Sequence, residues 1–303
     1  MINYEFKMQK IQNKIHRAKK SLGQNFLKSE PALRKIVEAG EIIPSDIILE
    51  IGPGKGALTE KLLDCASTVI AVEKDRELFN LLQEKFSKEI SDKKLILLNE
   101  DILEFDVKKI MQVVVLRTLG RSVDDEQRKF SAENFCGEQN NNLHNFSTNY
   151  KIIANIPYNI TGAILKKFLS EKNQPSMMVL MVQNEVAKRI VARDNKESIL
   201  SISVKAYGIP KIEMKVPARY FSPAPKVDSA IISIKNISRS FFIENKISEE
   251  RFWILIHAGF AHKRKKLSSN LKNYIGLAYA MELENKRAED LTLSDWLLLI
   301  KKD

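Results

Sequence analysis

The residues best suited to chemistry are five consecutive ones, Asn155-Ile156-Pro157-Tyr158-Asn159, which follow a short apolar run. The exocyclic amine of a nucleobase reacts poorly because its lone pair is delocalised into the ring. An asparagine side-chain oxygen and a nearby backbone carbonyl can hold the two amine hydrogens and turn the lone pair toward a methyl group. Pro157 restricts the backbone so that this carbonyl faces inward, and Tyr158 offers a stacking face worth ~1–3 kcal/mol. The segment predicts methyl transfer to a base amine, driven mainly by positioning; an ordinary turn after a strand is the alternative.

A glycine-rich turn forms a second candidate site, directly after the apolar run Ile47–Ile51. Gly52, Gly54 and Gly56 allow a sharp turn and a close approach to a ligand. Their spacing differs from the dinucleotide-binding pattern, and the Lys-Ser/Thr ending of a phosphate-binding loop is absent. The Glu50 carboxylate would repel a pyrophosphate but suits a cation. This favours S-adenosylmethionine, whose amino group and sulfonium are both positive, over a purely structural turn.

Two further acids follow the next two apolar runs. Glu73 ends one run, where a carboxylate can accept both hydroxyls of a ribose. Asp101, followed by Ile102, comes shortly after the other, where an acceptor can take the amino group of adenine. Either acid alone could equally be a helix cap or a surface charge. Because open α/β sheets bind ligands at the carboxyl ends of their strands, three acids in succession predict one adenosine-binding edge.

Apolar runs and helical patterns alternate along the chain, which is typical of βαβ units and of a mainly parallel sheet covered on both faces. A proline-punctuated turn between two later runs predicts an antiparallel hairpin that closes the sheet. The fold class is therefore α/β. We predict strands at Ile47–Ile51, Thr68–Val72, Leu95–Leu98, Tyr150–Ala154, Met177–Val182, Glu213–Val216 and Ser229–Lys235, and helices at Pro31–Glu41, Gly56–Ser67, Asp75–Ile90 and Gly162–Glu171.

Beyond residue 236 only helical patterns occur, at Ser248–Phe260, Arg264–Tyr274 and Ser294–Lys302. We therefore predict an α/β domain over residues 1–236 and a small all-helical domain over residues 237–303. Met111–Asn149 is too long for a simple connection. We expect a mobile insertion there, with a small ordered subdomain as the alternative.

The charge is unevenly distributed. The chain has 49 Lys and Arg against 38 Asp and Glu, and residues 1–35 hold nine of these bases and two of the acids. A second basic block, His257–Lys272, contains Lys263, Arg264, Lys265 and Lys266. Two such blocks favour a nucleic-acid footprint over solvated helix faces. Other features predict a cytoplasmic monomer without metal: no membrane-length apolar run, no secretory signal, no coiled-coil heptads, and only Cys65 and Cys136 as thiols.

From about Lys20 to Tyr274, the chain resembles the small-subunit ribosomal RNA adenine N6,N6-dimethyltransferases. The resemblance implies a Rossmann-like class I fold that uses S-adenosylmethionine, followed by a helical domain that binds rRNA. It also implies the substrate, two adjacent adenosines in a hairpin near the 3′ end of small-subunit rRNA, each dimethylated at N6 in an immature small ribosomal subunit. The motifs that carry it are Leu22–Leu27, Glu50–Thr59, Glu73, Asp101, Asn155–Tyr158, Phe221–Ser229 and Phe260–Leu271.

The resemblance also implies roles for individual residues. Phe221 would be a second aromatic near the target base, although its residue type alone indicates core packing. Asn25 alone would be read as a turn residue. By this resemblance, the residues that contact the methyl donor are Asn25, Leu27, Glu50, Gly52, Gly54, Gly56, Glu73, Asp101, Ile102 and Asn155. The residues that receive the target base are Asn155, Ile156, Pro157, Tyr158 and Phe221. The residues that bind phosphates are those of the basic extension 1–28, with Lys19 and Lys20, and Lys263, Arg264, Lys265 and Lys266.

Three other functions remain open at this stage. The related large-subunit enzymes of macrolide resistance share the Gln-Asn-Phe-Leu and Asn-Ile-Pro-Tyr stretches, but the Gly52-Pro53-Gly54 turn and the basic C-terminal segment favour the small-subunit family. A non-catalytic ribosome-assembly factor could have lost Glu73, Asp101, Asn155 or Tyr158, and all four are present. A methyltransferase for a small ligand would not need two basic blocks.

Overall fold

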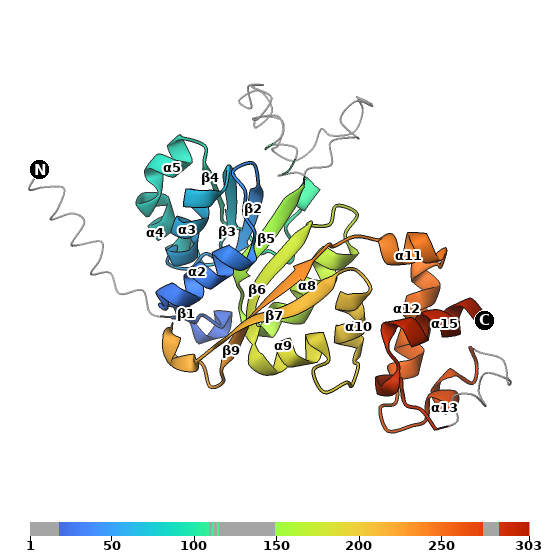
Figure 1. The fold of residues 1–303 in the computed structure, drawn as a ribbon. Helices are drawn as coiled ribbons and strands as arrows, with labels where there is room; N and C mark the ends of the chain where they lie inside the picture. Colours follow the sequence, from blue (N-terminus) through green and yellow to red (C-terminus); the bar gives the residue numbers. More distant parts are fainter. Residues whose placement is uncertain (1–17, 109–110, 112–113, 115–148, 275–284, 303) are drawn as a thin grey trace, which may run out of the picture.

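A seven-stranded sheet forms the centre of the protein, with the strand order β4-β3-β2-β5-β6-β9-β7 (Figure 1). The computed structural model describes residues 18–108, 111, 114, 149–274 and 285–302. The first five strands in this order are parallel, and β9 runs antiparallel to both β6 and β7. This confirms the predicted Rossmann-like α/β class. The strands are β2 Ile47–Ile51, β3 Thr68–Val72, β4 Leu95–Leu98, β5 Tyr150–Asn155, β6 Met177–Gln183, β7 Ile209–Val216 and β9 Ser229–Lys235.

The parallel strands are mainly apolar because both faces of the sheet are covered. Successive residues of β2 alternate between two hydrophobic clusters, with Ile48 in one and Leu49 in the other, both fully buried. Helices α2 and α3 pack together beside the sheet, and α8, α9 and α10 lie around its other half (Figure 1). The helices are α2 Glu30–Ala39, α3 Ala57–Cys65, α4 Arg76–Lys85, α5 Ser87–Ser91, α8 Thr161–Ser170, α9 Asn184–Val191 and α10 Ile199–Lys205.

The strand order reverses direction at β2. From β2 the chain proceeds outward through β3 to β4, and later returns to place β5 on the opposite side of β2. Loops after β2 and β5 therefore diverge to opposite sides and leave a crevice at the carboxyl ends of these strands, where ligands of open α/β sheets bind.

Two helical predictions differ from the structure. The single helix expected over Asp75–Ile90 is broken at Phe86, whose backbone leaves the helical region and whose ring is buried. The helix expected over Arg264–Tyr274 is only α13, Leu267–Leu271, because Lys266 is extended and the Asn270 side chain donates hydrogen bonds to the Gly259 carbonyl of the preceding helix and the His262 carbonyl of the loop. The basic residues before Leu267 therefore lie in a loop.

The predicted insertion begins inside the core. Met111 and Val114 are helical, almost fully buried and part of the larger hydrophobic cluster. The connection after β4 thus contributes to packing at its start. The remainder, residues 115–148, lies outside the described part of the chain. The expectation of a mobile insertion concerns these residues and stays a prediction.

All described elements after residue 236 are helical, as predicted. The largest fully buried side chains here are Trp296 and Phe252. Tyr207 of the α/β part packs against Phe242 and Trp253, so one hydrophobic cluster runs through both parts. None of the described helices is long and apolar enough to span a membrane. The elements are α11 Ser240–Asn245, α12 Glu249–Phe260, α13 Leu267–Leu271, a 3-10 turn Ala288–Asp290 and α15 Leu293–Lys302.

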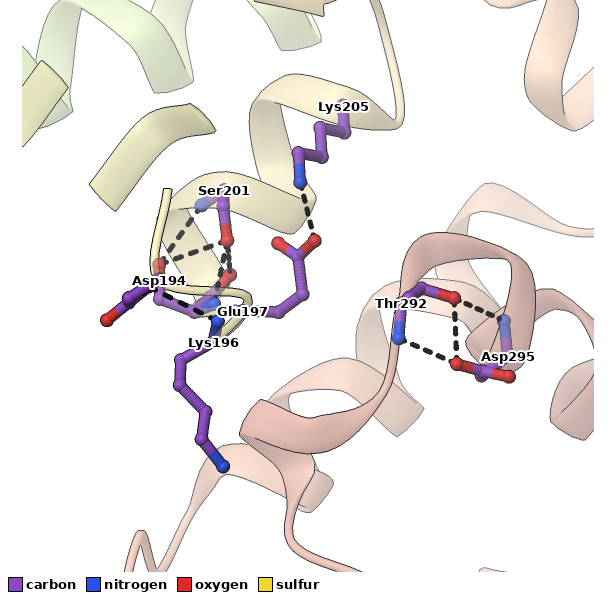
Figure 2. Close-up of polar contacts among 8 residues, drawn as sticks. Asp194, Lys196, Glu197, Ser201, Lys205, Thr292 and Asp295 are labelled. Atoms are coloured by element: carbon purple, nitrogen blue, oxygen red, sulfur yellow. Dashed lines mark hydrogen bonds and ion pairs between the residues drawn. The ribbon is translucent and has the colours of Figure 1, made fainter. Parts of the chain in front are cut away.

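Polar contacts also join the two parts, near the start of α10. Figure 2 shows the contacts that lie within each part at this place. The Glu197 amide donates a hydrogen bond to the Glu289 carbonyl at 2.8 Å. The Glu197 carboxylate, 8% exposed, pairs with Lys205. On the other side, Thr292 and Asp295 cap the first turn of α15 through reciprocal hydrogen bonds. Because the α/β part and the helical part share one hydrophobic cluster and several polar contacts, the division into two domains at residue 236 stays a prediction.

Candidate active site

A cavity of about 740 Å³ opens at the carboxyl ends of β2, β3, β4 and β5. Gly56 and Phe221 are the two predicted site residues of the donor and base sets that do not line it. All the others do, so residues from five separate stretches of sequence meet there. They are Asn25, Leu27, Glu50, Gly52, Gly54, Glu73, Asp101, Ile102, Asn155, Ile156, Pro157 and Tyr158.

The glycines of the turn have different tasks, although all three have positive φ. A Cβ on Gly52 would meet no atom within 4 Å, so its backbone leaves open space that a ligand can occupy. A Cβ on Gly54 would stand 3.1 Å from the Phe26 ring. A Cβ on Gly56 would come within 2.5 Å of the Phe86 ring. Gly52 therefore fits a close ligand approach, whereas Gly56 lets α3 pack on the segment that follows α4.

Glu50 is a buried acid with an unused oxygen. It is 1% exposed, and neither its Oε2 nor the buried Thr59 Oγ1 has a hydrogen-bond partner in the described part of the chain. Burial raises the pKa of Glu50 to about 8, and the nearby Glu73 charge acts in the same direction. A buried carboxyl without a partner is costly unless a ligand completes it. A ligand with positive charge fits this wall, as S-adenosylmethionine does.

Glu73 is held at the end of β3 by backbone hydrogen bonds. Its Oε2 accepts from the Gly54 amide at 3.1 Å, and its Oε1 accepts from the Asp75 amide at 2.8 Å. Asn99 donates to the Glu73 carbonyl at 2.8 Å. The carboxylate is thus fixed to the glycine turn itself, and a carboxylate oxygen can accept more than one hydrogen bond, so a ribose hydroxyl can be received there.

Asp101 lines the cavity after β4, the strand next to β3. Lys74 Nζ contacts its Oδ2 at 2.7 Å and the Leu103 amide donates to its Oδ1 at 3.0 Å. These two hydrogen bonds lower the pKa of Asp101, and the one from Lys74 has the larger effect. From α8, Lys167 Nζ donates to the carbonyls of Leu103 and Phe105 and holds the loop in place. Asp101 therefore presents a fixed acceptor suited to an amino group.

Asn155, the last residue of β5, is oriented by its own amide. Its Nδ2 donates a hydrogen bond to the Asn25 carbonyl at 3.2 Å, so its Oδ1 is the atom that can accept a hydrogen bond from a ligand. Among the described residues, none donates a hydrogen bond to the next carbonyl, that of Ile156. Within the described ranges, a side-chain oxygen and a backbone oxygen are thus both available at the end of one strand. This is the pair that the sequence predicts for holding an amine.

Tyr158 is anchored through its hydroxyl. The hydroxyl hydrogen-bonds Ser229 Oγ at the start of β9, and Thr161 Oγ1 donates to the Tyr158 carbonyl at 3.1 Å. Burial raises the pKa of Tyr158, so the phenol stays neutral. A ring that is fixed at its far end and lines the cavity offers a rigid stacking face.

A short two-stranded sheet completes the site, and the sequence did not predict it. Strand β1, Phe26–Leu27, pairs antiparallel with β8, Phe221–Ser222. This pairing draws the N-terminal segment, including Asn25, onto the cavity. Phe221 itself lies opposite Leu27 and is 3% exposed. Ser222 lines the cavity in its place, so contact of Phe221 with a base stays a prediction.

The predicted RNA-binding residues fall into two groups. Lys19 Nζ contacts Asp75 at 2.9 Å and Glu77 at 3.2 Å, so the structure uses it inside the protein. Nothing is described of the Lys20 side chain. The other four, Lys263–Lys266, are exposed in the loop between α12 and α13 and form no ion pair with a described carboxylate. That loop is a suitable phosphate contact.

Metal ligands do not cluster in the ranges that the structure describes: no three His, Cys, Asp or Glu side chains are placed to hold an ion. Cys65 is a free thiol. Cys136 lies outside these ranges. The expected absence of a metal and the expected monomer both stay predictions.

Comparison with known proteins decides the family. A family model described as ribosomal RNA adenine dimethylase matches residues 15–302. This chain belongs to that family. The match confirms the predicted class of enzyme, an rRNA methyltransferase that uses S-adenosylmethionine.

Named relatives of this rRNA adenine dimethylase agree with the family. A ribosomal RNA small subunit methyltransferase A from Dehalococcoides mccartyi is 37% identical over 289 residues, covering 92% of this chain and 86% of the relative. The enzyme of the same name from Fusobacterium nucleatum is 34% identical and covers 93% of this chain and 96% of its own.

Two solved structures share the fold. A dimethyladenosine transferase from Plasmodium falciparum gives a TM-score of 0.68 at 24% identity, over 91% of this chain and 96% of that one. The 23S rRNA methyltransferase ErmE gives 0.66 at 22% identity, over 92% and 99%. At these identities the likeness supports the class I fold and does not separate small-subunit from large-subunit substrates.

Proposed function

We propose that the protein transfers methyl groups from S-adenosylmethionine to N6 of two adjacent adenosines in the 3′-terminal hairpin of small-subunit rRNA, during maturation of the subunit. The products are N6,N6-dimethyladenosines. The observation that carries this proposal is the fixed amide of Asn155. The Asn155 side-chain nitrogen donates a hydrogen bond to the Asn25 carbonyl. The Asn155 side-chain oxygen and the Ile156 carbonyl then form a pair of acceptors at the cavity.

The two acceptors account for activation of the target amine. In the first transfer to each adenosine, the Asn155 Oδ1 and the Ile156 carbonyl each accept one N6 hydrogen, which turns the nitrogen lone pair out of the ring plane; in the second transfer, one of them accepts the hydrogen that remains. Tyr158 stacks on the base and restricts its rotation. No strong general base is needed, because the proton leaves after the nitrogen has gained its positive charge. The residues act by positioning, which can supply ~7–11 kcal/mol of a barrier.

The donor wall is built from the glycine turn and three acids. When bound, S-adenosylmethionine supplies an electrophilic methyl group on its sulfonium. Gly52 leaves the space for close approach, Glu73 receives the ribose hydroxyls and Asp101 receives the adenine amino group. Glu50 places a carboxyl against the positively charged part of the donor. Leu27 and Ile102 complete the wall with apolar surface.

The basic loop Lys263–Lys266 is proposed as a contact to the rRNA backbone. Its four side chains are exposed and lie on the helical part of the chain, outside the cavity lining. Phosphate contacts of this kind make affinity fall with salt. A helical rRNA-binding domain over residues 237–303, a monomeric state and a cytoplasmic location belong to the same proposal.

A methyl-transfer assay tests the proposal. Purified protein and labelled S-adenosylmethionine are combined with unmethylated small ribosomal subunits, and with large subunits as the control. Label is mapped by nuclease digestion and mass spectrometry. Dimethyladenosine in the 3′ hairpin of the small-subunit rRNA is expected. Label in large-subunit rRNA would assign the protein to the macrolide-resistance type instead, and donor binding without any transfer would indicate an assembly factor.

A further inference from the structure

One wall of the donor cavity is made by a single stretch of backbone, residues 19–28, which we call the strap. Ser21 to Lys28 all line the cavity. At its later end the strap is tied to the body by the β1–β8 pairing and by the Asn25 carbonyl on Asn155. At its earlier end it has no strand pairing, so side chains must hold it.

Three side chains provide that attachment. Gln24 Nε2 donates to Asp75 Oδ2 at 2.8 Å, and Lys19 Nζ donates to Asp75 Oδ1 at 2.9 Å. The Gln24 Oε1 accepts from the Lys19 amide at 2.8 Å. Gln24 thus uses both ends of its amide, and Lys19 both its amide and its ammonium, to join the strap to one carboxylate.

Asp75 is rigid and close to the donor residues. It is 3% exposed and is the N-cap of α4, where its Oδ1 accepts from the Glu77 amide at 3.0 Å. Its own amide donates to Glu73 Oε1 at 2.8 Å. The strap is therefore anchored one hydrogen bond away from the carboxylate assigned to the ribose.

We propose that Lys19, Gln24 and Asp75 are positioning residues that form a latch: they keep the strap closed on the cavity and so limit the rate at which the methyl donor leaves. This rests on S-adenosylmethionine as the donor. In this proposal the bound donor leaves when the strap opens, so its dissociation rate scales with the open fraction of the complex. Loss of a hydrogen bond to a charged group raises that fraction by about tenfold or more.

The test compares Gln24→Met with the wild-type chain. Methionine keeps the length of the side chain and removes the hydrogen bonds to the Lys19 amide and to Asp75. Binding of S-adenosylmethionine to the immobilised protein is followed by surface plasmon resonance. The expected result is a dissociation rate about tenfold higher, with faster association as well, because the free strap also opens more often. A dissociation rate within twofold of wild type would overturn the latch.

Matched variants separate a latch from a general loss of stability. Lys61→Met removes the Lys61–Glu30 ion pair, which has the same 2.9 Å distance but lies outside the cavity lining, and should leave donor exchange unchanged. Lys19→Met removes one arm of the latch and should give an intermediate rate; it also replaces Gln24→Met if that variant does not fold. If the wild-type chain binds no S-adenosylmethionine, the proposed function fails, independently of the latch.

Hydrogen–deuterium exchange gives a readout that does not depend on the donor. In Gln24→Met, the amides of residues 20–28 should exchange faster, while those of β2 and β5 keep their wild-type rates. Unchanged exchange in the strap would contradict the proposal, and so would an increase spread equally over the strap and the sheet.

Discussion

Glu50 should make the protein less stable as the pH rises from about 5 to 8. Its pKa is raised by burial from the ordinary 4.5 to about 8. In this window the folded protein holds a proton that the unfolded chain has lost, so each pH unit removes about 1.4 kcal/mol from the free energy of unfolding. The contribution is fully present below the ordinary pKa, declines through the window, and is lost above the folded pKa.

Glu50→Gln isolates this effect. Glutamine has nearly the same shape and cannot ionise, so the variant lacks the pH-dependent penalty while all other groups titrate as before. Between pH 5.5 and 7.5, wild type should lose about 2.5 kcal/mol of stability relative to the variant. Urea denaturation at three pH values measures the difference. If the two proteins follow parallel curves, Glu50 is ionised in the fold and the reasoning about its burial is wrong.

The same carboxyl links donor binding to proton release. A cationic ligand beside Glu50 favours the charged form, so the pKa of Glu50 should fall in the complex. Affinity for S-adenosylmethionine should therefore rise with pH between about 6 and 8, by less than tenfold per unit. Calorimetry in two buffers of different ionisation enthalpy should detect a released proton in wild type and none in Glu50→Gln.

Three further predictions concern the base, the turn and the RNA. Tyr158→Ala should reduce turnover about 10- to 100-fold with little change in donor affinity, as expected for ~1–3 kcal/mol of lost stacking; equal losses in both, measured by kinetics and calorimetry, would contradict the stacking role. Gly52→Ala should abolish donor binding with a stability loss of about 1–2 kcal/mol. Gly56→Ala should instead destabilise the fold by about 2–4 kcal/mol through its clash with Phe86. Thermal melts and donor titrations distinguish the two variants, and similar behaviour of both would refute the separate tasks of the two glycines. Replacing Lys263, Arg264 and Lys265 by Gln should lower the salt slope of rRNA binding by about 2–3, and an unchanged slope would exclude the loop as a phosphate contact.

The sequence predicts the sheet well because its parallel strands carry their own signal. Ile47–Ile51, Thr68–Val72 and Leu95–Leu98 are short, apolar and buried on both faces, and their bounds agree with the structure. Helices α9 and α10 were not predicted. Ser198 and Ser201 interrupt the apolar pattern around α10, and they are accommodated there because they bond each other in a capping box.

The sequence predicts those site residues that can be placed from their residue type and their position at the end of a strand. Glu73 and Asn155 each follow an apolar run, so their meeting at one edge follows from the parallel sheet. The partner of Gln24 is 51 positions away, and that of Lys19 is 56 positions away. Only the packed structure assigns such pairs. The ion pair of Lys19 with Asp75 could not be predicted from the sequence, and the expected phosphate contact of Lys19 stays a prediction.

The pairing of β1 with β8 has a consequence for synthesis of the chain. Phe26 lies opposite Ser222, so a wall of the donor site is fixed only when segments almost 200 residues apart have met. During translation, β2, β3 and β4 emerge early, but a nascent chain that ends before Phe221 lacks the strand that holds β1. Closing so long a loop is entropically costly and slow. The donor site should therefore be among the last parts of the enzyme to mature, after most of the parallel sheet.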